Sequence, residues 1–138
     1  MFLKFQYQKL PFIGQPNKAW ISRPYLTITI LGNGKQTKPF YALLDSGADT
    51  VLLPAELAVE IGIADYKSGR HEPVAGIIGK ADSYYHDAEI QVSGDTRKTS
   101  VEIGFMEKLT IPLLGRTFFG CFNSVVFKEA KHTFELRR

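Results

Sequence analysis

The residues with the clearest potential for chemistry are Asp45, Ser46 and Gly47, which directly follow an apolar run at residues 41–44. The triplet alone is a weak signal, because all three residue types are common in turns. The apolar run strengthens it, since it predicts a strand that carries the Asp45 carboxylate to a buried strand end with little water around it. A carboxylate there is costly unless it has a partner. The pattern therefore marks Asp45 as a carboxylate that needs a partner.

Other reactive residue types form no comparable group. Ser46 has no arrangement of His and Asp around it that the sequence reveals, which argues against a serine hydrolase. Cys121 is the only cysteine, so the chain can form neither an intrachain disulfide nor a cysteine-based zinc site, and its apolar surroundings favour a small buried side chain. We expect no metal site, because the three histidines are scattered without ligand spacing: His71, His86 and His132.

A glycine-rich segment, Gly76, Ile77, Ile78 and Gly79, lies between two stretches of strand-like sequence. Two interpretations are an ordinary hairpin turn and a weak phosphate-binding loop. The second fails, because no Lys followed by Ser or Thr stands in the required position and no helix begins there. The residues alone therefore support a turn between two strands.

The sequence predicts that Asp45 and the glycine-rich segment are positioned mainly by strands. Alternation, Thr and Ile content, and turn residues between runs predict strands at residues 3–7, 25–31, 40–44, 84–92, 99–103, 124–127 and 132–136. Good helix formers after Pro54 predict one short helix near residues 54–62, and a helical turn is expected near 116–121. The predicted fold class is all-β, in a single domain over residues 1–138.

The composition and charge of the chain limit the kinds of partner that it could bind. Apolar residues make up 44% of the chain and charged residues 22%, as in an ordinary globular protein. The formal charge of +3 comes from 17 basic and 14 acidic residues spread along the sequence, so we expect no nucleic-acid partner. The first residues alternate apolar with polar and lack the long apolar stretch of a signal peptide or membrane span. We therefore expect no membrane association and a cytoplasmic location.

At several separate points between residues 23 and 122 the sequence resembles the retropepsin family of aspartic proteases. Arg23 and the strand after it resemble the family's opening strand, and residues 42–52 resemble its catalytic segment. Residues 113–116, Leu-Leu-Gly-Arg, resemble its second signature. Residues 76–79 occupy the place of the glycine-rich flap that closes over substrate. The resemblance implies a closed acid-protease barrel and an aspartic endopeptidase that needs no cofactor.

The resemblance also implies a second copy of the chain. Hydrolysis by this route needs two carboxylates that share one proton, one acting as general base on water and the other polarising the peptide carbonyl. One chain supplies only Asp45, so a homodimer would place its two-fold axis between two Asp45 side chains. The substrate would be an extended peptide bound as an added strand, with apolar side chains near the scissile bond.

Further roles follow from the same resemblance. Ser46 would hydrogen-bond to backbone across the two-fold axis, and Gly47 would let a peptide backbone approach closely. Asp49 would accept hydrogen bonds from substrate backbone and pair with the Arg116 guanidinium. The remaining assigned positions are Ala48 in the cleft wall, Gly76, Ile77, Ile78 and Gly79 in the flap, Gly115 behind the catalytic loop, and Arg23 of the other subunit in the ion network.

Three alternatives stay open at this point. Asp45 could be an ordinary aspartate in a strand-end turn. The chain could be a catalytically silent retropepsin-like module for dimerisation or peptide binding, because a fold can persist without its chemistry. A small β-barrel that binds nucleic acid would instead show salt-sensitive binding. The terminal hairpin predicted within residues 124–136 is longer than the C-terminus of retroviral members and resembles bacterial single-domain relatives, so the place of the dimer sheet is also open.

Overall fold

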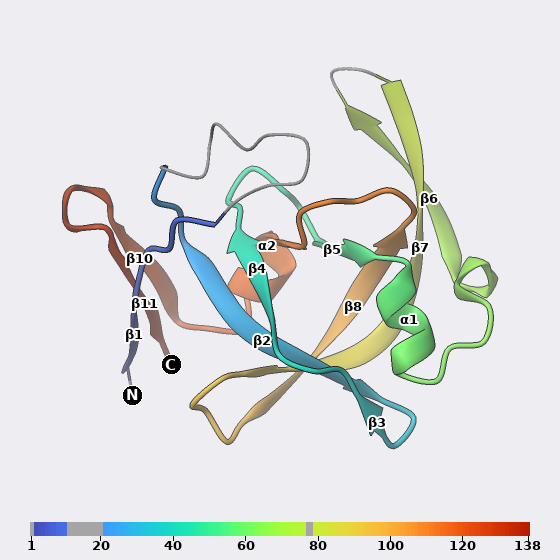
Figure 1. The fold of residues 1–138 in the computed structure, drawn as a ribbon, viewed down its shortest axis with the longest axis horizontal. Helices are drawn as coiled ribbons and strands as arrows, with labels where there is room; N and C mark the ends of the chain where they lie inside the picture. Colours follow the sequence, from blue (N-terminus) through green and yellow to red (C-terminus); the bar gives the residue numbers. More distant parts are fainter. Residues whose placement is uncertain (1, 11–20, 77–78) are drawn as a thin grey trace.

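The computed structural model describes residues 2–10, 21–76 and 79–138. Most of the secondary structure is strand, arranged in two sheets (Figure 1). The larger sheet has eight strands in the order β3-β2-β4-β9-β5-β8-β7-β6, and the smaller has three in the order β1-β11-β10. The strands are β1 (Phe2–Gln6), β2 (Tyr25–Gly32), β3 (Lys35–Gln36), β4 (Phe40–Leu44), β5 (Val51–Pro54), β6 (Arg70–Gly76), β7 (Gly79–Val92), β8 (Lys98–Met106), β9 (Leu113–Leu114), β10 (Ser124–Lys128) and β11 (Thr133–Arg137).

The larger sheet closes into a barrel, because β2 pairs with strands on both of its sides. Leu26 of β2 lies opposite Ala42 of β4, and further along the strand Ile30 lies opposite Ile90 of β7. The closed ring contains the six strands β2, β4, β9, β5, β8 and β7, with β3 and β6 outside it. The all-β fold class and the closed barrel predicted from the sequence are confirmed.

Alternation along the strands fills the barrel with apolar side chains. On β2, Leu26, Ile28 and Ile30 are fully buried, and on β8, Ile103 and Phe105 are fully buried as well. Burial of a side chain of this size stabilises the fold by about 1.5–3 kcal/mol, so the core fixes the register of the strands around it. The ends of those strands, where the candidate site lies, are held in place by this packing.

The helices are short, and one begins later than the sequence suggested. They are α1 (Glu56–Glu60) and α2 (Arg116–Phe119), with single turns of 3-10 helix at η2 (Tyr66–Ser68) and η3 (Glu129–Lys131). Pro54 is not in the helix but ends β5, because it continues the parallel pairing of that strand and lies opposite Met106. Among the described residues no helix has the length and apolar character needed to cross a membrane.

The terminal hairpin, predicted from the sequence, forms a separate sheet together with the first strand. β11 lies in the middle and pairs with β10 on one side and with β1 on the other, at the left of Figure 1. Phe134 and Leu136 of β11 are fully buried and belong to the same hydrophobic cluster as the barrel core. The two sheets therefore share one core.

Glu135 lies on the opposite face of β11 and is also buried, with 3% of its surface exposed. The Lys128 ammonium lies 2.6 Å from its carboxylate, and the Arg137 guanidinium lies 3.0 Å away. Hydrogen bonds from Lys128 and then Arg137 lower the pKa of Glu135 below its usual range. Because the ionised form is the one that makes these bonds, Glu135 stabilises the sheet only while it is charged.

This geometry predicts a pH-dependent effect for Glu135→Gln. A carboxyl with a lowered pKa in the folded state contributes stability above its unfolded pKa of about 4.3 and loses that contribution as the pH falls through the folded value. The variant should therefore melt at a lower temperature than the wild type at pH 7, and the gap should close below about pH 4. Thermal unfolding followed by circular dichroism measures it.

Glu60→Gln, at an exposed position on α1, is the matched control and should show no such pH-dependent gap. A Glu135→Gln gap of equal size at pH 3 and pH 7 would contradict the assigned role of the charge.

Candidate active site

Asp45 stands at the end of β4, at the point where two separate parts of the chain run side by side. Leu43 and Leu44 pair in parallel with Leu113 and Leu114 of β9. The Asp45 amide continues that pairing by donating a hydrogen bond to the carbonyl of Leu114 at 3.0 Å. Leu44 and Leu114 are buried, whereas Asp45 is only partly buried. The backbone of Asp45 is thus fixed by the core while its side chain reaches the surface of the barrel end.

The turn after β4 orients the carboxylate. The Ala48 amide donates to the carbonyl of Asp45 at 3.1 Å, which closes the turn. The Gly47 amide donates to Oδ1 of Asp45 at 2.9 Å. Within the described part of the chain, this amide is the hydrogen-bond donor to the Asp45 carboxylate, so one oxygen is held by the turn. Ser46 and Gly47 themselves are exposed.

Gly115 lies directly behind the segment that follows Asp45. A Cβ atom on Gly115 would be 2.3 Å from the carbonyl oxygen of Thr50 and 2.5 Å from that of Ala48. Real Cβ atoms do not approach backbone oxygens so closely, and only glycine allows this passage. The structure therefore places Gly115 where the sequence analysis expected it, behind the loop that carries Asp45.

The start of α2 is bonded to the same segment through backbone. The Arg116 amide donates to the carbonyl of Ala48 at 2.8 Å, and the Thr117 amide donates to the carbonyl of Asp49 at 3.0 Å. The first amides of a helix have no hydrogen-bond partner inside the helix. These contacts therefore satisfy the first two amides of α2 and also hold the segment after Asp45 in place.

The side chains of Asp49 and Arg116, expected to form an ion pair, do not contact each other in the described structure. Both side chains are exposed. The two positions are neighbours through the backbone hydrogen bonds of α2 instead. The expected ion pair is therefore replaced by main-chain hydrogen bonds, which the sequence pattern could not reveal.

Arg23 lies just before β2 and forms an isolated bridge with Gln8, in which each residue's amide donates to the other's carbonyl. Burial raises the pKa of Tyr25, and the nearby Arg23 guanidinium partly offsets that rise. Pro24, between them, accepts a hydrogen bond from the Leu44 amide at 3.0 Å. The opening strand thus supports the last residue before Asp45.

The glycine-rich segment belongs to the long hairpin formed by β6 and β7, which rises beside the barrel at the right of Figure 1. Gly76 and Gly79 are the last pair of this hairpin. Ile77 and Ile78, the two residues expected at the flap tip, lie outside the described residues. A hairpin at this place in the chain agrees with the turn that the residues predicted.

A second hydrophobic cluster, separate from the main core, joins this hairpin to the site. Its buried members are Leu52, Tyr85 and Met106, with the partly buried residues Val74, Leu109 and Leu113 packed against them. Leu113 pairs with Leu43, close to Asp45, and Val74 belongs to the hairpin. We name this group the site cluster. Sequence patterns did not identify Tyr85 as a member of this cluster, because its contacts depend on which strands lie side by side in the barrel.

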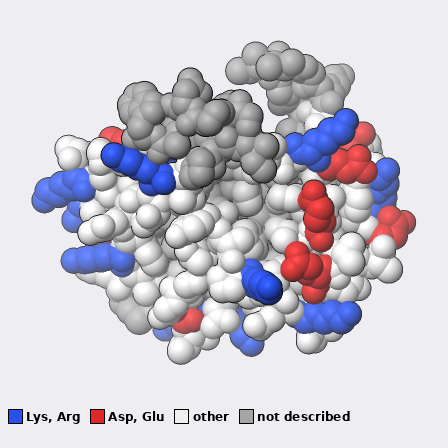
Figure 2. Space-filling model, viewed as in Figure 1, with Lys and Arg blue, Asp and Glu red and all other residues white. Residues whose placement is uncertain are grey.

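Charged side chains lie mainly around the margin of the face shown in Figure 2, with an uncharged area at its centre. Acidic and basic groups are mixed on the right side of this view. Among the described residues, opposite charges pair with each other, as Lys67 does with Glu107 and Arg70 with Glu102. On this face the basic groups form no continuous surface.

Comparison with known proteins gives similarity to solved structures and no match among sequences. No family of related sequences matches the chain, and no curated protein matches it. Among solved structures the chain is similar to the EIAV protease complexed with the inhibitor HBY-793, with a TM-score of 0.49 and 25% identity. The similarity covers 71% of this chain and 86% of that one. The function assigned to this chain therefore depends on the geometry around Asp45.

The close passage of Gly115 predicts a large effect for Gly115→Ala. The added methyl group would collide with two backbone carbonyls that cannot rotate away, so the Asp45 segment must shift. We expect the free energy of unfolding to fall by about 1–3 kcal/mol or more, measured by urea denaturation.

Gly120→Ala is the matched control, because a Cβ there would have no atom closer than 3.6 Å and the backbone is already helical. Its free energy of unfolding should be nearly unchanged. Equal losses in the two variants would contradict the role given to Gly115.

Proposed function

We propose that this chain is an aspartic endopeptidase of the retropepsin type that acts as a homodimer, with one catalytic carboxylate, Asp45, from each copy. The observation that carries the proposal is the setting of Asp45. Its amide is fixed to Leu114 of a neighbouring strand, and its carboxylate is oriented by the Gly47 amide at the end of β4, where Leu44 is buried. The end of β4 thus supplies one rigidly placed carboxylate at the surface of the barrel.

The chemistry would use the two carboxylates as a pair that shares one proton. The ionised carboxylate takes a proton from water as the water oxygen attacks the peptide carbonyl carbon, while the protonated carboxylate donates a hydrogen bond to the carbonyl oxygen. The tetrahedral intermediate then loses the amine, whose nitrogen receives a proton from the pair. Water is the only co-reactant, so the proposed reaction needs no cofactor.

A second copy is required because the chain supplies one Asp45. An isologous interface brings identical residues together on its two-fold axis, which would pair the two carboxylates. The exposure of Ser46, Gly47 and Asp49 beside Asp45 supports this arrangement, since the surface around the carboxylate is available to a partner. Ser46 would then reach backbone across the axis, and Arg23 of the other subunit would approach the exposed Asp49 carboxylate.

The terminal sheet limits where the two copies can pair through strands. β11 is paired on both sides within one chain, so its backbone groups are already used. Among the described strands of that sheet, only β1 and β10 have an outer edge. A dimer built by strand pairing through the terminal sheet would therefore use one of those edges. In this proposal residues 1–138 act as a single domain, which the core shared by both sheets supports.

The site cluster supports a preference for apolar peptide side chains. Leu52 and Leu113 lie opposite each other next to the Asp45 strand, and Val74 approaches from the hairpin. An extended peptide between hairpin and barrel would place alternate side chains against this surface. Ala48 would form part of the wall, and the hairpin from Gly76 to Gly79 would cover the peptide. A cytoplasmic location and the absence of a nucleic-acid partner stay predictions from sequence.

The test of the proposal is Asp45→Asn, which removes the titrating carboxyl and keeps its shape. We expect the variant to fold normally and its cleavage of a library of apolar peptides to fall by about 100- to 10,000-fold, which is the usual contribution of a general base. Asp87→Asn, at an exposed position on β7, should cleave like the wild type.

Two outcomes would overturn the assignment. Unchanged cleavage by Asp45→Asn would remove the proposed catalytic residue. A folded wild type that binds peptides and cleaves none would instead identify the chain as a catalytically silent module.

The shared site also predicts how activity responds to an inactive copy. When wild type is mixed with an equal amount of Asp45→Asn and the subunits exchange, random pairing leaves about half of the wild-type chains in active dimers. Activity per wild-type chain should fall to about half and should fall further with excess variant. Activity that stays constant would show that each chain works alone, and Asp87→Asn serves as the control for mixing.

A further inference from the structure

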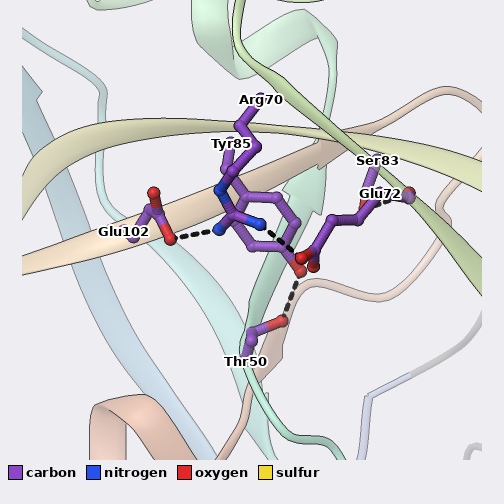
Figure 3. Close-up of polar contacts among 6 residues, drawn as sticks. All are labelled: Thr50, Arg70, Glu72, Ser83, Tyr85 and Glu102. Atoms are coloured by element: carbon purple, nitrogen blue, oxygen red, sulfur yellow. Dashed lines mark hydrogen bonds and ion pairs between the residues drawn. The ribbon is translucent and has the colours of Figure 1, made fainter.

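The buried tyrosine of the site cluster, Tyr85, spans the barrel wall between the hairpin and the Asp45 segment (Figure 3). Tyr85 of β7 lies opposite Arg70 on β6 and opposite Gly104 on β8. Its ring lies against the backbone of Gly104, where a Cβ would be only 2.8 Å from the Cζ atom of the ring. Glycine at position 104 therefore makes room for the ring to cross β8.

Beyond β8 the Tyr85 hydroxyl meets Thr50, which lies immediately before β5. The distance between the hydroxyl oxygen of Tyr85 and Oγ1 of Thr50 is 2.7 Å. Tyr85 is 6% exposed, so this hydrogen bond is largely shielded from water. The carbonyl of Thr50 is the same group that lies against Gly115. Thr50 is thus held from two sides, by backbone from behind and by Tyr85 from the hairpin.

On the side of the ring that faces Arg70, a set of polar contacts holds Tyr85 in place. The Arg70 guanidinium lies over the Tyr85 ring, 4.6 Å from its centre. Arg70 is itself paired with Glu102 of β8 at 2.5 Å and with Glu72 of its own strand. The Ser83 hydroxyl donates to the carbonyl of Glu72 at 2.9 Å, which ties β7 to β6. These groups leave the ring one orientation, with its hydroxyl directed at Thr50 (Figure 3).

We propose that the hydrogen bond between Tyr85 and Thr50 is a positioning contact that sets the height of the β6–β7 hairpin over the Asp45 segment. Within the described residues it is the one side-chain hydrogen bond between that hairpin and residues 45–50. Its consequence for activity rests on the proposed function, because the hairpin and the segment would form the two sides of the peptide site. A small displacement of either side weakens every contact with an extended peptide at once.

The contact acts on binding and not on the reacting atoms. Its loss should weaken the ground state and the transition state equally, which raises KM and leaves kcat and the pH profile unchanged. A role in folding alone would have another signature, because a smaller folded fraction lowers the apparent kcat and leaves KM as it was. The two parameters therefore distinguish positioning from stability.

The experiment is a double-mutant cycle with Tyr85→Phe and Thr50→Val, assayed on the peptide that wild type cleaves best. Tyr85→Phe keeps the ring under Arg70, and Thr50→Val keeps the shape of the side chain. Each single variant should raise KM by about 2- to 10-fold, the usual range for one hydrogen bond. The double variant should be no worse than either single variant, because both remove the same contact.

Two controls accompany the cycle. Thr50→Ser keeps the hydroxyl and should retain a KM close to that of wild type. Tyr66→Phe removes another tyrosine hydroxyl, which is bonded to Glu107 outside this contact, and should leave KM unchanged. Additive effects of Tyr85→Phe and Thr50→Val, or a fall in kcat with constant KM, would overturn the positioning role.

Failure of this inference can be told apart from failure of the proposed function. If wild type cleaves nothing, the protease assignment fails, and amide hydrogen exchange still measures the contact. Tyr85→Phe should then speed exchange in β6 and in the hairpin half of β7 while leaving β2 unchanged. Equal exchange in wild type and Tyr85→Phe would overturn the positioning role whatever the activity.

Discussion

Gly115 lies so close to the carbonyls of Ala48 and Thr50 that no other residue type fits, and much of the site depends on this approach. It lets β9 run directly beside β4, which in turn allows the Asp45 amide to bond to Leu114. It also brings the first amides of α2 to the carbonyls of the same segment. The absence of a side chain at Gly115 therefore allows β9, α2 and the Asp45 segment to meet in one rigid junction.

The junction explains why Asp45 can be held in one position without being deeply buried. Its backbone belongs to the barrel, where packing leaves little freedom, while its carboxylate is oriented by the local Gly47 amide. On the hairpin side, Tyr85 adds a second restraint at the far end of the segment, on Thr50. A segment held at both ends can present its exposed middle, including Ser46, to a substrate or to another copy of the chain.

The terminal sheet gives this chain an architecture of its own around that junction. β10 and β11 form a hairpin that pairs with β1 of the same chain and buries Phe134 and Leu136 in the common core. The pairing of β11 is thus complete within one chain. Association of two copies would then serve to bring two Asp45 carboxylates together, and it need not complete the fold of either copy.

The sequence by itself determined most of the elements and marked Asp45 as the candidate for chemistry. Period-two alternation predicted most strands, and the apolar run before Asp45 correctly placed it at a strand end, because both signals are local properties of the chain. The turn at Asn33 and Gly34 follows a local rule too, because both residues have positive φ values, which few residue types adopt. The short strand β5 escaped prediction because its pairing with β8 joins distant parts of the chain.

Only the tertiary structure decided which groups make the contacts. Asp49 and Arg116 were expected to pair through their charges, but backbone amides of α2 join the two positions instead. The contact of Tyr85 with Thr50 was invisible in the sequence, because it exists only where a glycine on the strand between them, Gly104, leaves space for the ring. The alternation of residue types along the chain determines which segments form strands. The order of the strands in the closed barrel determines which side chains come into contact.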